Sequence, residues 1–200
     1  MKTRPYHHGD LRTTLLTLAE DTLRDRGAAE LSLRELAREA GVSPAAPSRH
    51  FKSKQALLDA LALEGFDRLN AVMSAALAEA GDTFAARLDR VARAYMGFST
   101  GNAALLELMY ARKHDPDVAE ELKAATRRMT GLVNQVIEDG QRRGEVRAGD
   151  VDLLVIPLAA ALQGLTALLQ SGGFGAERIE SGLTETIAFI RRGYAPCEGP

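Results

Sequence analysis

Basic side chains surround a run of very small residues between positions 34 and 54, a combination suited to binding a polyanion. The small residues would let the backbone approach the edges of bases, and they are Ala45, Ala46 and Ser48. The basic residues can donate hydrogen bonds to phosphate oxygens, and they are Arg34, Arg49, His50, Lys52 and Lys54. The chemistry predicted for this stretch is contact with double-stranded DNA.

Signals for a helix, a tight turn and a second short helix would position these residues. Ser32 and Glu35 have the spacing of a capping box at the start of the first helix, and Gly41 can adopt the left-handed conformation that ends it. Ser43 can cap the second helix, and Pro44 suits its first position. This order predicts a helix-turn-helix whose second helix, residues 43–51, enters a DNA major groove, although a helical hairpin of another function could carry the same signals.

Pro47 disturbs the predicted second helix. A proline at its fourth position removes a backbone hydrogen bond and pushes Ala46 away from ideal helical geometry. We therefore expect a short recognition helix with a 3₁₀-like or distorted start.

The segment from Gly41 to Lys54, GVSPAAPSRHFKSK, resembles the DNA-binding domain of TetR-family (TetR/AcrR-like) transcriptional regulators. The similarity extends over about residues 6–66. It implies an all-α protein with an N-terminal three-helix helix-turn-helix domain and a C-terminal helical ligand-binding and dimerisation domain. It also implies a homodimeric repressor that leaves a palindromic operator when a small apolar or amphipathic effector occupies its core.

The resemblance also suggests which side chains contact DNA. The family usually has an aromatic residue, most often tyrosine, where this chain has Ser48, which keeps a hydroxyl and lacks the ring. The predicted DNA-binding residues are Ser32, Arg34, Ser43, Pro44, Ala45, Ala46, Ser48, Arg49, His50 and Lys54.

The charge distribution agrees with a DNA-binding N-terminal part. Residues 1–55 carry ten lysine and arginine residues against seven acidic ones, while the rest of the chain carries 15 against 20. A basic arm containing His7 and His8 precedes the first helix. Phosphate contact is favoured over metal binding there, because adjacent histidines do not share a helix face and no acid or thiol completes a site.

Helical periodicity continues through the whole chain. We expect helices over about residues 11–26, 54–81, 84–98, 102–110, 116–140, 151–171 and 176–192, with caps that include Ser53, either Asp82 or Thr83, Asp115 and Asp150. The predicted domains are a helix-turn-helix domain with its basic arm at 1–53, an effector-binding and dimerisation domain at 54–194, and a tail at 195–200.

The helix expected at 151–171 is apolar on all sides. A membrane span is disfavoured because the run is slightly short and contains Pro157, Gln163 and Gly164. We expect this helix and the last one to form a homodimer interface across a two-fold axis, the alternative being a purely intramolecular core.

Several large side chains on these helices could line an effector cavity, although large apolar side chains at helical spacing are by default ordinary core. Gln163 is the strongest single candidate, because a buried amide needs partners and Gly164 leaves room beside it. The tentative effector-binding residues are Phe66, Tyr95, Phe98, Met109, Tyr110, Met129 and Gln163.

Catalytic and cofactor motifs are missing from the sequence, so we predict no enzyme, no cofactor and no metal. There is no phosphate-binding glycine loop, no H-E-x-x-H, no paired cysteine and no nucleophile elbow. Cys197 is the one cysteine, which excludes an intrachain disulfide and suits a cytoplasmic protein. Two alternatives stay open: a DNA-binding protein without an effector, and a helical small-molecule-binding protein or enzyme that lacks specific operator recognition.

Overall fold

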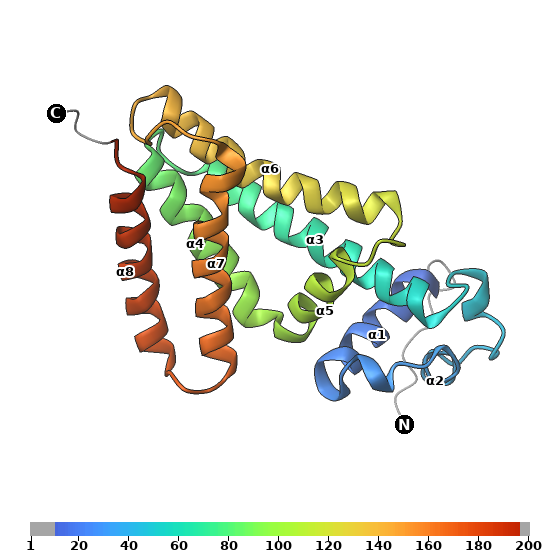
Figure 1. The fold of residues 1–200 in the computed structure, drawn as a ribbon. Coiled ribbons are helices and arrows are strands. Elements are labelled where there is room, and N and C mark those ends of the chain that lie inside the picture. Colours follow the sequence, from blue (N-terminus) through green and yellow to red (C-terminus); the bar gives the residue numbers. More distant parts are fainter. Residues whose placement is uncertain (1–10, 197–200) are drawn as a thin grey trace. The chain divides into compact units, whose positions relative to one another are not determined.

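The computed structural model describes residues 11–196, and in that range it consists of helices and loops without a strand (Figure 1). The predicted all-α fold is confirmed. In chain order the helices are α1 (Leu11–Arg26), the 3₁₀ turn η1 (Ala28–Glu30), α2 (Leu33–Glu39), the 3₁₀ turn η2 (Pro47–Arg49), α3 (Lys54–Ala78), α4 (Phe84–Gly101), α5 (Ala103–Lys113), α6 (Glu120–Arg142), α7 (Val151–Gln170) and α8 (Ala176–Tyr194).

The chain divides into two compact units. The first runs to residue 65 and takes in residues 104–123, and the second contains residues 66–103 and the chain from residue 124 onward. Helix α3 begins in the first unit and continues without a break into the second. The predicted domain boundary between residues 53 and 54 lies at the start of this helix, whereas the two compact units divide inside it, between residues 65 and 66.

Three helix starts follow from capping residues, as predicted. The side chain of Ser53 accepts a hydrogen bond from the amide of Ala56 at 3.1 Å. Thr83 caps α4 through a 3.2 Å bond from the amide of Ala86, and Asp150 caps α7 through a 2.9 Å bond from the amide of Asp152. Each oxygen satisfies one of the amides that a helix leaves without a partner at its N-terminus.

One predicted capping box and one predicted helix start are wrong. Ser32 is the N-cap residue of α2 but makes no side-chain cap bond, and the carboxylate of Glu35 binds Arg38 at 3.1 Å instead of completing the capping box. Helix α6 begins at Glu120 rather than at Pro116. The reason is that Asp115 accepts a bond from the amide of Asp117 at 2.9 Å, which closes a local turn there.

Each unit has its own hydrophobic core. In the first unit, α1, α2 and η2 contact one another, and the fully buried side chains include Leu15, Leu36, Phe51, Leu57 and Leu61. In the second unit, α4, α7 and α8 contact one another, and Figure 1 shows α7 and α8 as an antiparallel pair. Its buried side chains include Leu88, Val91, Leu154, Leu158, Leu183 and Ile187.

Substituting Gly140 by alanine is expected to destabilise the protein by about 1–3 kcal/mol. An added Cβ would lie 2.5 Å from Cγ2 of Val146 and 3.1 Å from Cδ2 of Phe84, so the packing at the end of α6 must shift. The matched control is Gly131→Ala in the same helix, where an added Cβ meets nothing within 4 Å. That change should stabilise by about 0.5–1 kcal/mol through helix propensity. Urea unfolding measures both, and a Gly140→Ala protein as stable as Gly131→Ala would contradict the prediction.

Candidate nucleic-acid interface and effector region

Residues 43–51, which we call the recognition segment, follow α2 through a left-handed glycine. Gly41 has a φ of +69°, a conformation that other residues rarely adopt, and its amide bonds to the backbone oxygen of Arg38 at 3.2 Å. The segment then turns on itself, with the amide of Ala46 bonded to the oxygen of Ser43 at 2.9 Å. A surface pocket of about 490 Å³ lies beside it, lined by Ser32, Arg34, Glu35, Arg38, Val42 and Pro44.

The recognition segment contains one 3₁₀ turn and no α-helix, so the predicted 3₁₀ character is present but the predicted helix over residues 43–51 is wrong. Pro47 is buried and begins this turn, and its backbone oxygen accepts bonds from the amides of His50 and Phe51, both at 2.9 Å. The hydroxyl of Ser48 donates to the backbone oxygen of Ala45 at 2.7 Å. In this conformation the single proton of Ser48 is already used, so its hydroxyl is left with acceptor capacity only.

The predicted DNA-binding residues lie together in the first unit, and most of them face solvent. Ala46 and Lys54 are partly buried, and the remaining eight are exposed, namely Ser32, Arg34, Ser43, Pro44, Ala45, Ser48, Arg49 and His50. The recognition segment is anchored from beneath by Phe51, which is 1% exposed and has the guanidinium of Arg12 4.9 Å from its ring centroid. The exposed polar residues of this segment are therefore held in place by a buried aromatic side chain.

Lys54, at the first residue of α3, has an intramolecular partner that the sequence did not suggest. Its Nζ donates to the backbone oxygen of Ala29 at 2.7 Å, which ties α3 to the η1 turn. An ammonium group has three donors, so this bond leaves capacity for a phosphate.

Arg112 forms a charge cluster in the first unit that sequence reasoning missed. Its side chain is 13% exposed, and it binds Asp59 of α3 at 2.6 Å and Asp115 at 2.7 Å. The amide of Gln55 faces the same guanidinium, and since arginine can only donate, Gln55 turns its oxygen toward it. Burial alone would disfavour the charge, but the bonds to Asp59 and Asp115 outweigh it and raise the pKa of Arg112.

The tentative effector-binding residues do not all lie in one unit. Phe66, Tyr95 and Phe98 are buried in the second unit, where Met129 is partly buried. Met109 and Tyr110 belong to the first unit. Tyr110 is partly buried under Lys113, whose Nζ lies 4.1 Å from the ring centroid, and burial lowers the pKa of this lysine.

The expectation that Gln163 is a buried amide is wrong. Its side chain is exposed on α7, beside the exposed Gly164. The reason is that the sequence of a helix that is apolar on all sides does not indicate which face packs against the core. In α7 the buried side chains include Leu154, Leu158 and Leu162.

The buried amide of the second unit is Asn70 on α3, which the sequence analysis did not single out. It is 8% exposed, and its Nδ2 donates to the backbone oxygen of Ala125 at 3.0 Å, while its Oδ1 has no hydrogen-bond partner. The available signal was a single polar residue between Leu69 and Met73 in an otherwise apolar stripe.

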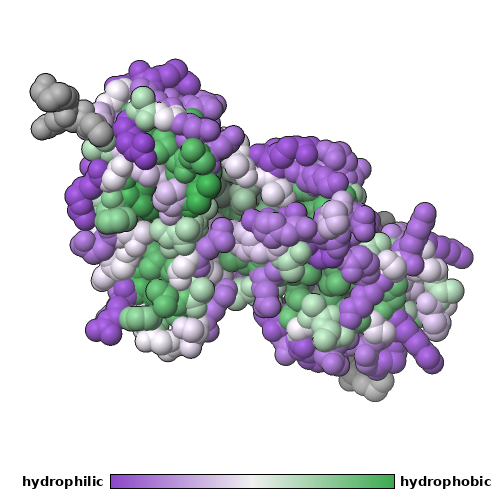
Figure 2. All heavy atoms as spheres, in the orientation of Figure 1, coloured by the Kyte–Doolittle hydropathy of each residue, from purple (hydrophilic) through white to green (hydrophobic). Residues whose placement is uncertain are grey.

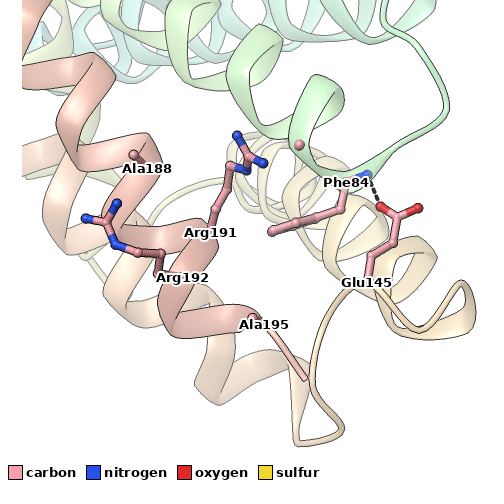
Figure 3. Close-up of a pocket in the computed structure, with 7 residues that line it drawn as sticks. Phe84, Glu145, Ala188, Arg191, Arg192 and Ala195 are labelled. Atoms are coloured by element: carbon pink, nitrogen blue, oxygen red, sulfur yellow. Dashed lines mark hydrogen bonds between the residues drawn. The ribbon is translucent and has the colours of Figure 1, made fainter. Parts of the chain in front are cut away.

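A surface pocket of about 490 Å³ lies between the ends of α4 and α8 (Figure 3). It is lined by Phe84, Ala85, Glu145, Ala188, Arg191, Arg192 and Ala195, so it contains none of the predicted effector residues. The carboxylate of Glu145 accepts a bond from the amide of Phe84 and another from Arg143 at 3.1 Å. It therefore serves the N-terminus of α4, and the pocket presents no catalytic acid or base pair.

The sequence predicts that the chain binds no metal ion, and it disfavours a membrane span. Within residues 11–196 no group of three or more histidine, cysteine, aspartate or glutamate side chains is placed to hold a metal ion. His7, His8 and Cys197 lie outside the described residues. In the same range α7 is the one helix long and apolar enough to span a membrane by length and composition.

The N-terminal and C-terminal parts of the chain each match a known protein-family model. Residues 15–61 match the model of bacterial regulatory proteins of the tetR family, and residues 88–188 match the model of the tetracyclin repressor-like C-terminal domain. The HTH-type transcriptional regulator UidR of Escherichia coli K12 is 27% identical over 136 residues, which is 68% of each chain.

Solved structures are similar over nearly the whole chain. A Rhodococcus sp. RHA1 protein of unknown function has a TM-score of 0.89 and 40% identity, and the alignment covers 96% of this chain and 100% of that one. The regulator FadR of Bacillus subtilis, solved in complex with stearoyl-CoA, has a TM-score of 0.75 and 15% identity over 90% and 98% of the two chains. The second likeness concerns the fold alone.

Proposed function

The chain belongs to the TetR family of bacterial regulatory proteins and is a transcriptional regulator rather than an enzyme, and from this premise we propose that it is a homodimeric, ligand-released repressor. In this proposal the recognition segment lies in the major groove of a palindromic operator, and a small molecule in the C-terminal core causes release. The protein would act in the cytoplasm, where its DNA lies.

The observation that carries the DNA-binding part is the exposed recognition segment on a buried anchor. Exposed Arg34, Arg49 and His50 supply donors to phosphate or base edges, and exposed Ala45 offers a methyl group for contact with thymine. Because the segment has one 3₁₀ turn and no α-helix, its reading surface is short. The Ser48 hydroxyl donates its proton to the backbone oxygen of Ala45. This bond supports the proposal that the arginine side chains contribute more than Ser48 to the choice of operator sequence.

The dimer part of the proposal rests on the outer face of α7 and α8. Figure 2 shows hydrophobic side chains at the surface over these helices. Leu153 is 65% exposed, Ile156 58% and Phe189 70%, values that are high for large apolar residues unless a partner covers them. A shallow pocket of about 550 Å³ on this face is lined in part by the small residues Ala160, Ala161 and Gly164. The occupant that fits is the same face of a second copy, which a two-fold axis would bring against it.

The test begins with selection of bound sequences from a random DNA pool, followed by a screen for compounds that release the selected DNA. The expected result is a palindromic site whose half-sites are about one helical turn, or a multiple of it, apart. A pool that shows no enrichment at low salt would contradict operator recognition.

Arg34→Ala is expected to weaken operator binding by about 1–3 kcal/mol and to relax the preference at one base position. Arg34 is exposed and lies beside the pocket next to the recognition segment. Lys54→Ala is the comparison, since loss of a phosphate contact should weaken binding equally for all sequences and reduce the salt dependence. Titrations of the selected site and of single-base variants at several salt concentrations measure both. An equal loss for every sequence in Arg34→Ala would make Arg34 a backbone contact.

A further inference from the structure

One buried amide in the second unit makes a single hydrogen bond through its nitrogen and none through its oxygen. Asn70 is 8% exposed, and its 3.0 Å bond to the backbone oxygen of Ala125 joins α3 to α6. Only the amide nitrogen can donate to a carbonyl oxygen, so this bond fixes the orientation of the side chain. The oxygen Oδ1 is thereby held as an acceptor without a partner.

The chain itself supplies no donor for this oxygen among the residues that the structure describes. Three other buried hydroxyls each give their one proton to a carbonyl of their own helix, namely Thr22 to Leu18, Ser99 to Tyr95 and Thr166 to Leu162. Phe66 and Met73 share the helix face of Asn70, and both are apolar and at most 2% exposed. An unsatisfied acceptor in such surroundings lowers stability, and a leucine of similar size would avoid that cost.

We propose that Oδ1 of Asn70 accepts a hydrogen bond from the effector, and that the effector is a neutral, largely apolar molecule with one hydroxyl or amide N–H group. This inference rests on the proposed function, in which a small molecule occupies the core. The acceptor needs a donor, which a carboxylate cannot offer. An ammonium group would bring a charge that the apolar neighbours cannot compensate.

The position of Asn70 on α3 also indicates how such a ligand would enter the core and affect this helix. Its oxygen is closed to solvent, so the ligand must enter by displacing apolar side chains between α3 and α6, and the flexible thioether of Met73 is suited to such a movement. Helix α3 is continuous from Lys54 to Ala78. A ligand bonded to Asn70 therefore acts directly on the helix that begins with the predicted phosphate contact.

The test uses two isomers of the same formula, 1-decanol and 1-methoxynonane, which differ in whether the oxygen carries a hydrogen. Calorimetric titration of the full chain should give about tenfold tighter binding of the alcohol, which is the effect of one hydrogen bond. In Asn70→Leu the two isomers should bind equally. Thr166→Val, which removes a buried hydroxyl that already has its partner, is the matched control and should keep the tenfold preference.

Equal binding of the two isomers to the natural chain, or binding of neither, overturns the inference. A tenfold preference that persists in folded Asn70→Leu overturns it as well. The comparison on the natural chain needs no variant, so a folding defect in Asn70→Leu does not block the test. Sequence-selective DNA binding is measured separately on the same preparation. If it is present without an alcohol preference, only this inference fails, and if it is absent the proposed function fails.

Discussion

Replacing Phe189 by aspartate is expected to convert the proposed dimer into monomers and to lower operator affinity by a factor of about 10²–10⁴. Phe189 is 70% exposed on α8, so a carboxylate there leaves the core of the single chain intact. In the proposed dimer the same position is buried, and a two-fold axis doubles the buried charge. A monomer contacts one half-site and loses the gain that comes from linking two reading surfaces.

Sedimentation and titration of the selected operator measure the two parts of this result. The matched control is Val72→Asp, which places the same charge on another exposed apolar residue, 43% exposed on α3 and outside the proposed interface. It should leave both the mass and the affinity unchanged. A Phe189→Asp protein that stays dimeric would exclude this face of α8 as the interface.

Arg112→Ala is expected to lower the free energy of unfolding by about 2–3 kcal/mol. Removing one partner of a buried ion pair usually costs about 3–5 kcal/mol, and the partial exposure of Asp59 and Asp115 reduces the loss. The change leaves both carboxylates without their common guanidinium, and it removes this polar link between α5 and α3. Urea unfolding gives the magnitude.

Arg128→Ala is the matched control for this prediction. Arg128 binds Asp67 of α3 at 2.6 Å, the same distance as in the Arg112–Asp59 pair, but its side chain is 55% exposed and that of Asp67 is 51% exposed. Because exposed pairs are screened by water, we expect a loss below about 1 kcal/mol. Equal losses in the two variants would show that burial does not distinguish these ion pairs.

The Arg112 cluster also has a pH dependence of defined sign. The amide of Asp117 and the guanidinium of Arg112 lower the pKa of Asp115 below its ordinary 3.8. The stabilisation from this carboxylate is therefore complete above the ordinary pKa and is lost as the pH falls through the lowered one. In Arg112→Ala the acid-induced part of this loss should be smaller, which unfolding curves between neutral and acidic pH would show.

Local features of the fold were predictable because their causes lie within a few residues. Ser53, Thr83 and Asp150 each cap a helix through an amide two or three residues away. Pro47 has no amide to donate and begins the 3₁₀ turn, but Ala46 keeps helical angles, with φ −64° and ψ −42°, so the expected displacement of Ala46 is wrong. The capping box at Ser32 is absent, and Glu35 pairs instead with Arg38, three residues further along the helix.

The sequence by itself therefore determined the all-α class, the position of the helix-turn-helix and the family, since spacing, caps and motif residues are local. Only the tertiary structure decided which polar groups meet. Arg112 and Asp59 are 53 positions apart, and Asn70 and Ala125 are 55 apart, so no periodicity links them. The same holds for Gln163, because in a helix that is apolar on all sides only packing selects the face that turns inward.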